Sequence, residues 1–213
     1  TLLNLQEITV SPAERKELHR ALTLLASSPS RTLTDLNIQD ERLRSGLTHY
    51  TLAGGLPLLD ADKDCLTESH FQVFELEHLM SMGKKNIIPV LLYLFHQIEN
   101  RLDGRPTLVV LEEAWLLISH SAFSDKLEDW LRTLRKKNAA VVLVTQSLSE
   151  IAKAKQGDLI VESCPTKIFL PNPEASTPHN SRLYGELGLT KRQIEIIAQA
   201  VPKREYYYVS PLG

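Results

Sequence analysis

The chain has 213 residues, which is enough for one ordinary domain or for a domain with an appendage. Hydrophobic residues make up 43% of the sequence and charged residues 23%, a composition typical of a globular protein with a sizeable core. The net charge of −2 and the pI of about 6.4 give no global attraction to nucleic acid or to an anionic membrane. Two cysteines, Cys65 and Cys164, fit a reduced cytosolic protein, and no apolar stretch has the roughly 18–20 residues of a membrane span.

Residues 1–55 carry a helical pattern with short breaks. Ser11 followed three residues later by Glu14 is a capping-box signature, and leucines then recur at helical spacing, so we predict a helix over residues 12–27. Two further helices are expected, a short one containing Leu36 and Ile38 after a cap at Thr34-Asp35, and one over residues 40–50. We therefore expect residues 1–55 to form a small all-helical subdomain and residues 56–213 to form the remaining domain portion.

The next segment, residues 56–70, is polar and predicts a loop. Its D-x-D-x-D run invites a calcium-loop interpretation, but the sixth position lacks glycine and the twelfth, Phe71, lacks the glutamate that such loops use. The run therefore does not favour a metal site. A strand is expected over residues 72–76 and a long apolar helix over residues 86–102, with Pro89 in its first turn, where proline is tolerated.

A continuous apolar run from Leu108 to Leu111 predicts a short strand that is buried on both faces. Glu112 and Glu113 follow at its carboxyl end, which is where open parallel sheets bind ligands. Adjacent residues of an extended chain point to opposite sides, so the two carboxylates are expected to do different jobs. In P-loop nucleotidases the first acid of such a pair helps to hold Mg²⁺ and the second polarises the attacking water. The competing interpretation is a strand that ends in solvated acids.

The rest of the chain alternates helices with strands. An amphipathic helix is expected over residues 125–137, with Arg135 in the basic cluster at its end, where positive charge suits the helix dipole. A second apolar strand over residues 139–144 follows, and Thr145-Gln146-Ser147 closes it. The remaining elements are a strand over residues 166–170, a helix over residues 190–200 and a strand over residues 206–209. This alternation predicts an α/β fold with a mostly parallel sheet.

A resemblance to a known family rests on four stretches that occur in a fixed order, L-V-V-L-E-E-A-W, W-L-R-T-L-R-K-K-N-A-A-V-V-L-V-T-Q-S, E-S-C-P-T-K-I-F-L-P-N-P and P-K-R-E-Y-Y-Y-V-S-P. Together they closely resemble the C-terminal ATPase domain of the conjugative-transfer and type IV secretion ATPases, the TrbE/CagE kind. The similarity covers nearly the whole chain and is strongest from Phe71 to Gly213. It implies a RecA-like P-loop NTPase core of the FtsK/HerA-like superfamily, and residues 11–52 resemble the small all-alpha insertion of those ATPases.

The resemblance also implies roles for five residues. Glu112 occupies the Walker B position that binds Mg²⁺, and Glu113 matches the catalytic glutamate that orients the hydrolytic water. Gln146 matches the glutamine that senses the γ-phosphate of ATP. Arg135 aligns with an arginine that reaches a neighbouring subunit's nucleotide in related hexamers, a role that suits the planar guanidinium. Arg204 is a second candidate for a contact with nucleotide or with a neighbouring subunit.

Some of these roles have a competing structural interpretation. Gln146 would simply cap the turn that follows the second strand, and Arg135 would belong to a solvated helix end. Both alternatives stay open at the level of sequence. Trp115, Trp130 and the tyrosines at positions 206–208 are assigned to the core rather than to a functional site.

Two features depart from the family pattern. The family usually has Asp at the position of Glu112, and the extra methylene is expected to shift the coordination of Mg²⁺ while keeping the charge. In addition, no G-x-x-x-x-G-K-[ST] motif occurs, because Gly83-Lys84 is followed by Lys85. We therefore expect the phosphate-binding loop to lie upstream of Thr1, in a longer protein of which this sequence is a portion, and the chain alone to be inactive in ATP hydrolysis.

The function implied by the resemblance is Mg²⁺-dependent ATP hydrolysis that energises type IV secretion or conjugative transfer, through substrate transport or assembly of the apparatus. Homo-oligomers, with a hexamer as the expected form, would work with other secretion components at the cytoplasmic face of the bacterial inner membrane. Two alternatives remain: a DNA-translocating motor of the coupling-protein or HerA-like type, and a catalytically weak RecA-like assembly scaffold. Contact with DNA is left open, although the acidic balance argues mildly against it.

Overall fold

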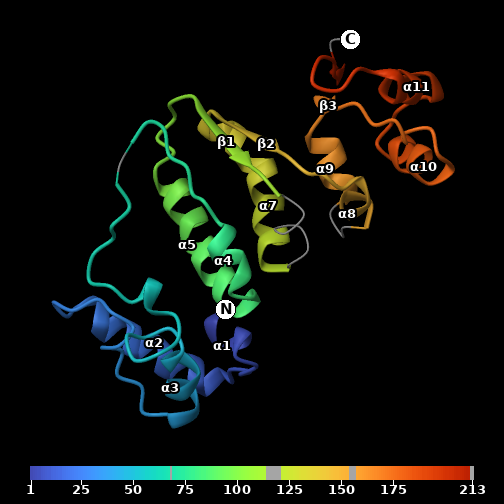
Figure 1. The fold of residues 1–213 in the computed structure, drawn as a ribbon. Helices are drawn as coiled ribbons and strands as arrows, with labels where there is room; N and C mark the ends of the chain where they lie inside the picture. The colour runs from blue at the N-terminus through green and yellow to red at the C-terminus, as the bar shows by residue number, and fades with distance from the viewer. Residues whose placement is uncertain (68, 114–120, 154–156, 212–213) are drawn as a thin grey trace. The chain divides into compact units, whose positions relative to one another are not determined.

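A computed structural model describes residues 1–67, 69–113, 121–153 and 157–211. The chain divides into two compact units, Thr1–Asn100 and Arg101–Gly213, and each is described by itself (Figure 1). The division into a helical subdomain of residues 1–55 and a portion of residues 56–213 stays a prediction. Among the described residues, no helix has the length and apolar character needed to cross a membrane.

The first unit is built from helices α1 (Leu2–Leu5), α2 (Pro12–Ala26), α3 (Glu41–Thr48), η1 (Pro57–Leu59), α4 (Glu77–Ser81) and α5 (Lys84–Asn100). The predicted capping box is confirmed, since the Glu14 amide donates to Ser11 Oγ at 3.3 Å and the Ser11 amide donates to Glu14 Oε2 at 2.7 Å. Asp40 caps α3 by accepting from the Leu43 amide at 2.9 Å. The helix predicted over residues 40–50 is therefore also confirmed.

The short helix expected around Leu36 and Ile38 is wrong. These two side chains are buried in the core beside Leu43 from a segment that consists of bends and turns. The segment is held instead by Asp60, which is only 2% exposed and accepts from the Thr34 amide at 3.1 Å and the Leu52 amide at 2.7 Å. The first acid of the D-x-D-x-D run is thus a structural residue, because buried carboxylates need such donors.

The strand expected over residues 72–76 is also wrong. The segment has no regular secondary structure, Val73 is 73% exposed, and no β-ladder joins it to a described strand. An isolated extended segment gains no ladder hydrogen bonds, so its β propensity alone does not make a strand. The long helix after it is confirmed as α5, and it begins at Lys84 rather than at residue 86. Pro89 consequently lies in the second turn and not in the first.

Pro89 has a structural consequence within α5. Proline has no amide hydrogen, so the carbonyl of Lys85 cannot receive the usual bond from four residues later. The hydroxyl of Tyr50, a fully buried side chain, donates to this carbonyl at 3.1 Å. The neighbouring His49 Nε2 lies 2.6 Å from Asn86 Oδ1. These two contacts fix the segment after α3 to the start of α5.

The second unit begins with two parallel strands, β1 (Thr107–Leu111) and β2 (Ala139–Leu143), which lie side by side (Figure 1). Between them in sequence come α7 (Ser121–Thr133) and η2 (Leu134–Lys137), which confirm the predicted amphipathic helix. Leu127 and Trp130 of α7 are buried, and Trp130 is fully so. Trp115 lies outside the described residues.

Only one face of β1 is buried, which corrects the expectation that both would be. Val109 is 8% exposed, whereas Leu108 is 63% exposed and Val110 is 52% exposed. Leu111 packs with Leu127 and Ile160 in a small hydrophobic cluster. The continuous apolar run therefore behaves as an alternating strand with one covered face.

The remaining elements are α8 (Leu148–Lys153), α9 (Gly157–Ser163), β3 (Lys167–Phe169), α10 (Pro178–Glu186), α11 (Lys191–Gln199) and β4 (Tyr207–Val209). β3 and β4 pair in antiparallel orientation, so the described strands form a parallel pair and a separate antiparallel pair rather than one mostly parallel sheet. Phe169 and Ile197 belong to the core beside this second pair. Tyr207 packs against that core, but Tyr206 and Tyr208 are 65% and 50% exposed, which corrects their assignment to the core.

Candidate functional site

The carboxyl ends of β1 and β2 lie level with each other. The parallel register pairs Leu111 with Leu143, and the Val144 amide donates to the Leu111 carbonyl at 2.9 Å. Glu112 and Glu113 follow β1 directly, and Gln146 follows β2 three residues after its last residue. The register therefore brings the polar residues after both strands to the same edge of the sheet, where α/β proteins bind their ligands.

The two glutamates differ in exposure and in backbone conformation. Glu112 is exposed, whereas Glu113 is half-buried and has a φ angle of 51°. A non-glycine residue in this left-handed region costs about 1–2 kcal/mol and is found most often where a site constrains the backbone. The strand thus ends in a sharp turn at Glu113. The two adjacent carboxylates therefore differ in exposure, and their different jobs stay a prediction.

A hydrogen bond joins the two strand ends through their side chains. Gln146 Nε2 donates to Glu113 Oε1 at 2.9 Å. The turn after β2 is closed by Thr145, whose Oγ1 accepts from the Ser147 amide at 3.1 Å. The described side-chain hydrogen bond of Gln146 goes to Glu113 and not to the turn after β2, which weighs against the interpretation of Gln146 as a turn cap.

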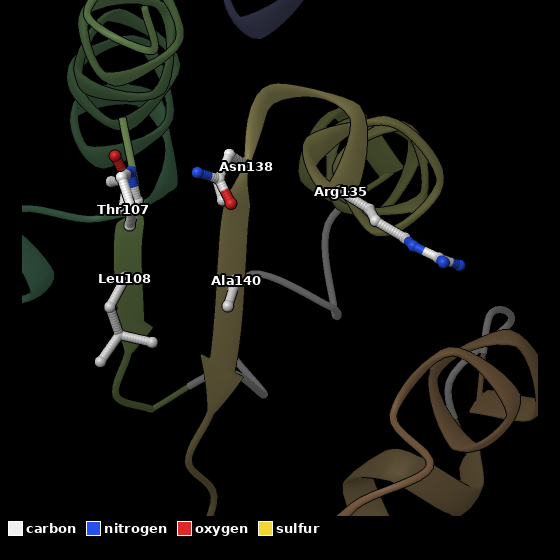
Figure 2. Close-up of a pocket in the computed structure, with 7 residues that line it drawn as sticks. Thr107, Leu108, Arg135, Asn138 and Ala140 are labelled. Atoms are coloured by element: carbon white, nitrogen blue, oxygen red, sulfur yellow. The ribbon is translucent and has the colours of Figure 1, made fainter. Parts of the chain in front are cut away.

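Arg135 lies at the opposite end of the same strands. It belongs to η2, which immediately precedes β2, and a five-residue strand spans roughly 16 Å. Figure 2 shows its guanidinium directed away from the strands, beside a hollow of about 370 Å³ whose lining includes Thr107 and Asn138. Arg135 is exposed. The described structure therefore does not bring Arg135 to the Glu113–Gln146 pair of its own chain.

Arg204 lies in the turn before β4, on the antiparallel pair of strands, and is exposed. Its amide donates to the Val201 carbonyl at 3.2 Å as part of that turn. The described contacts thus unite Glu113 with Gln146 and place Arg135 and Arg204 on other elements.

The role of Asn138, which anchors the start of β2, was not predicted from the sequence. Asn138 adopts a left-handed conformation, with φ 56° and ψ 35°, between η2 and β2. Its Nδ2 donates to the Gly104 carbonyl at 3.1 Å, and its own carbonyl accepts from the Thr107 amide at 3.1 Å. Asn tolerates the left-handed conformation better than most residues. An Asn between the basic run and the apolar strand could therefore have predicted a left-handed turn at this position.

Cys164 packs against the hydrophobic cluster of Leu127 and Ile160, next to the parallel pair of strands. Burial raises the pKa of its thiol, although the charge of Lys167 opposes this. A thiol with a raised pKa is a poor nucleophile and a poor metal ligand at neutral pH. Cys164 is therefore an apolar packing residue rather than a member of a reactive site.

Comparisons with known proteins agree with the resemblance seen in the sequence. Residues 38–208 match the family described as the TraG P-loop domain. The chain is 48% identical to a probable conjugal transfer protein TrbE of Sinorhizobium fredii, covering 100% of this chain and 32% of that protein. It is 28% identical to "Type IV secretion system protein virB4" of Bartonella henselae, covering 96% of this chain and 27% of that protein.

A solved structure, that of VirB4 of Thermoanaerobacter pseudethanolicus, matches with a TM-score of 0.66 at 16% identity, covering 98% of this chain and 66% of that chain. At this identity the match shows a common fold. The chain spans about a third or less of the length of the two relatives named above. The family match over residues 38–208 and the TrbE and VirB4 relatives show that the chain belongs to the TraG P-loop domain family of conjugative-transfer and type IV secretion proteins.

Proposed function

We propose that this chain supplies the water-activating portion of an ATP-hydrolysing P-loop domain that energises conjugative transfer or type IV secretion. The observation that carries the proposal is the Glu113 carboxylate, which is held at the carboxyl end of β1 by Gln146 from the end of β2. A carboxylate in this position, in a chain of a P-loop family, suits a general base for the attack of water on the γ-phosphate of ATP.

Glu112 is the residue that we propose for Mg²⁺. Mg²⁺ prefers oxygen ligands and is usually held by one or two carboxylates together with water and substrate phosphates. Glu112 fits this use, since its carboxylate is exposed beside the proposed base. No group of three or more His, Cys, Asp or Glu side chains among the described residues forms a protein-only metal cage. When bound, the ion would neutralise charge on the phosphate oxygens.

The phosphate-binding loop is proposed to come from sequence upstream of Thr1. The printed sequence contains no G-x-x-x-x-G-K-[ST] motif, and the relatives are about three times as long or longer. Without that loop and its lysine, nothing here would cradle the β- and γ-phosphates. We therefore expect the isolated chain to be inactive and the longer protein to be active.

Arg135 is proposed to act in trans, on the nucleotide of a neighbouring subunit. Its exposure, and its place at the other end of β2 from Gln146, support a role outside its own site. An arginine supplied by a neighbour would couple hydrolysis to assembly of a homo-oligomer, for which a hexamer is the expected form. Arg204, on the turn before β4, is a second candidate for such a contact. We place the assembly at the cytoplasmic face of the inner membrane with other secretion components.

A DNA-translocating motor is the second candidate function. It is favoured by one observation, three consecutive exposed cations, Arg135, Lys136 and Lys137, in η2. Such a cluster can bind phosphates, and the affinity would then fall steeply with salt. The overall net charge of −2 does not add to this attraction. A catalytically weak scaffold is the alternative if hydrolysis is absent.

The test of the proposed function is complementation of a donor strain that lacks the gene for this protein. Wild type and Glu162→Gln, which changes an exposed glutamate of α9, are expected to restore transfer equally. Glu113→Gln is expected to reduce the transfer frequency on the order of 10²-fold or more, because the general base is lost. Equal transfer by all three proteins would overturn the proposal.

A further inference from the structure

The Glu113–Gln146 contact links the segments that follow two paired strands, and it joins an exposed glutamine to a half-buried glutamate. The two strands stay paired to their last residues, up to the bond from the Val144 amide to the Leu111 carbonyl at 2.9 Å. Beyond this point the ladder between the two strands ends. The side-chain bond of 2.9 Å then joins the two turns, one made by a left-handed glutamate and the other by a threonine side chain.

The described hydrogen bonds of the turn after β2 do not use Gln146. The Ser147 amide donates to Thr145 Oγ1 at 3.1 Å, and Ser147 Oγ lies 2.9 Å from Ser149 Oγ. Serine and threonine side chains commonly close such turns. Because these contacts hold the backbone of the turn, the Gln146 side-chain amide is available to donate to the Glu113 carboxylate.

The chemistry of the two groups suggests what the contact does. An amide N–H is a neutral donor, so it fixes the orientation of a carboxylate and leaves the negative charge in place. An arginine or lysine donor would neutralise that charge. Contact through Oε1 also fixes the direction of the other oxygen, Oε2. A defined donor reduces the number of rotamers that a glutamate side chain samples.

We propose that Gln146 is a positioning residue for Glu113, which deepens the proposed function and rests on it. Gln146 holds Oε1, and Oε2 takes a proton from the attacking water while the water oxygen bonds to the γ-phosphorus. The bond from that phosphorus to the bridging oxygen breaks, and ADP leaves with the electron pair. Glu113 then returns its proton to phosphate or solvent. The two side chains therefore act on the water as one unit, unlike a glutamine that senses the γ-phosphate independently.

The test is a double-mutant cycle in the full-length protein, with kcat for ATP hydrolysis and the Kd of a fluorescent non-hydrolysable ATP analogue as readouts. Gln146→Ala is expected to lower kcat about 10- to 100-fold, the range for a hydrogen bond to a charged group, and to change Kd by less than about twofold. In the Glu113→Gln background, Gln146→Ala is expected to cause no further loss, because residues that act as a unit are not additive. Gln199→Ala, an exposed glutamine of α11, is the matched control and should keep both values.

Each other outcome identifies which idea fails. If Gln146→Ala weakens analogue binding, and its loss of kcat adds to that of Glu113→Gln, glutamine acts on the nucleotide and the positioning role is overturned. If Gln146→Ala keeps the wild-type kcat while Glu113→Gln abolishes it, the positioning role fails and the proposed function survives. If Glu113→Gln keeps the wild-type rate, or the wild type does not hydrolyse ATP, the proposed function fails and this inference fails with it. An unchanged thermal midpoint of Gln146→Ala excludes misfolding as the cause of any loss.

Discussion

Gln146 Nε2 donates to Glu113 Oε1 at 2.9 Å, across the carboxyl ends of two parallel strands. This bond joins two of the residues that the sequence analysis proposed for chemistry, whereas Arg135 lies at the opposite end of β2. The local site is therefore made of the glutamate and the glutamine, with Glu112 exposed beside them. Arg135 lies outside this local site.

The Mg²⁺ dependence of hydrolysis tests the role of Glu112. Glu112→Asp restores the residue usual in the family and keeps the charge, so the full-length variant is expected to hydrolyse ATP with an altered half-saturating Mg²⁺ concentration. Glu112→Ala removes the charge and is expected to raise that concentration about tenfold or more. Rates measured across a Mg²⁺ titration decide this, and identical curves for wild type and Glu112→Ala would remove Glu112 from the metal site.

Subunit mixing tests whether Arg135 acts in trans. Arg135→Ala is expected to lower hydrolysis on the order of 10³-fold, as for other arginines supplied by a neighbour. Mixed with an equal amount of Glu113→Gln subunits, it should regain activity, because about one quarter of the interfaces then pair an intact Glu113 with an intact Arg135. Arg182→Ala, which changes an exposed arginine of α10 paired with Glu186 at 3.6 Å, is the control. A wild-type rate for Arg135→Ala would support the solvated helix end instead.

The contact of Tyr50 with the Lys85 carbonyl predicts a coupling to Pro89. Tyr50→Phe removes the donor at 3.1 Å from the Lys85 carbonyl, a part-buried contact, which should cost about 0.5–1.5 kcal/mol in the free energy of unfolding. With Pro89→Ala, the amide of residue 89 can supply the missing helical bond, so Tyr50→Phe should cost less in that background. Chemical denaturation of the four proteins measures this. Equal costs in both backgrounds would show that the hydroxyl does not compensate for the proline.

The capping box predicts a pH dependence of stability. The hydrogen bond donated by the Ser11 amide, followed by that donated by the Arg42 guanidinium, lowers the pKa of Glu14 from 4.5 to about 2. Because the folded pKa is the lower one, the stabilisation is present above about pH 4.5 and is lost as the pH falls toward 2. Glu14→Gln keeps a capping side chain but does not titrate. The difference in melting temperature between wild type and this variant should therefore shrink from about pH 5 to about pH 2, and a constant difference would contradict the assignment.

The elements that could be predicted from the sequence have strong local signals. The capping box at Ser11 indicated the start of α2, and the helix expected from residue 190 corresponds to α11, which Thr190 caps. The spacing of apolar residues around Trp130 indicated α7. The short apolar runs indicated β1 and β2. In these cases the local preference and the final packing agree, which is why one sequence window is sufficient.

The elements that could not be predicted depend on partners elsewhere. Residues 72–76 have the composition of a strand, but a strand also needs a neighbour, and no ladder includes them among the described residues. Leu36 and Ile38 are buried without a helix because Asp60, from a distant loop, holds their segment. The faces of β1 differ because only one of them is covered. Each of these features depends on residues that are distant in the sequence, so a short stretch of sequence cannot predict it.

Part of the candidate site could be predicted from the sequence and part of it could not. The end of the first apolar strand identified Glu112 and Glu113 as candidates, since parallel strands bind ligands at their carboxyl ends, and the family resemblance added Gln146. The left-handed backbone of Glu113 and the bond from Gln146 could not be predicted, because glutamate has no intrinsic preference for positive φ. The roles of the five proposed residues remain predictions that the experiments above test.

The measurement that tests the central claim most directly is single-turnover ATP hydrolysis by the full-length protein, wild type against Glu113→Gln, at saturating nucleotide and Mg²⁺. Glu162→Gln serves as the matched control for loss of a carboxylate outside the site. We expect Glu113→Gln to bind ATP but to hydrolyse it at a rate lower by about 10² to 10⁴, the usual contribution of a general base. A rate for Glu113→Gln equal to that of the wild type would contradict the assignment of Glu113 as the group that activates water.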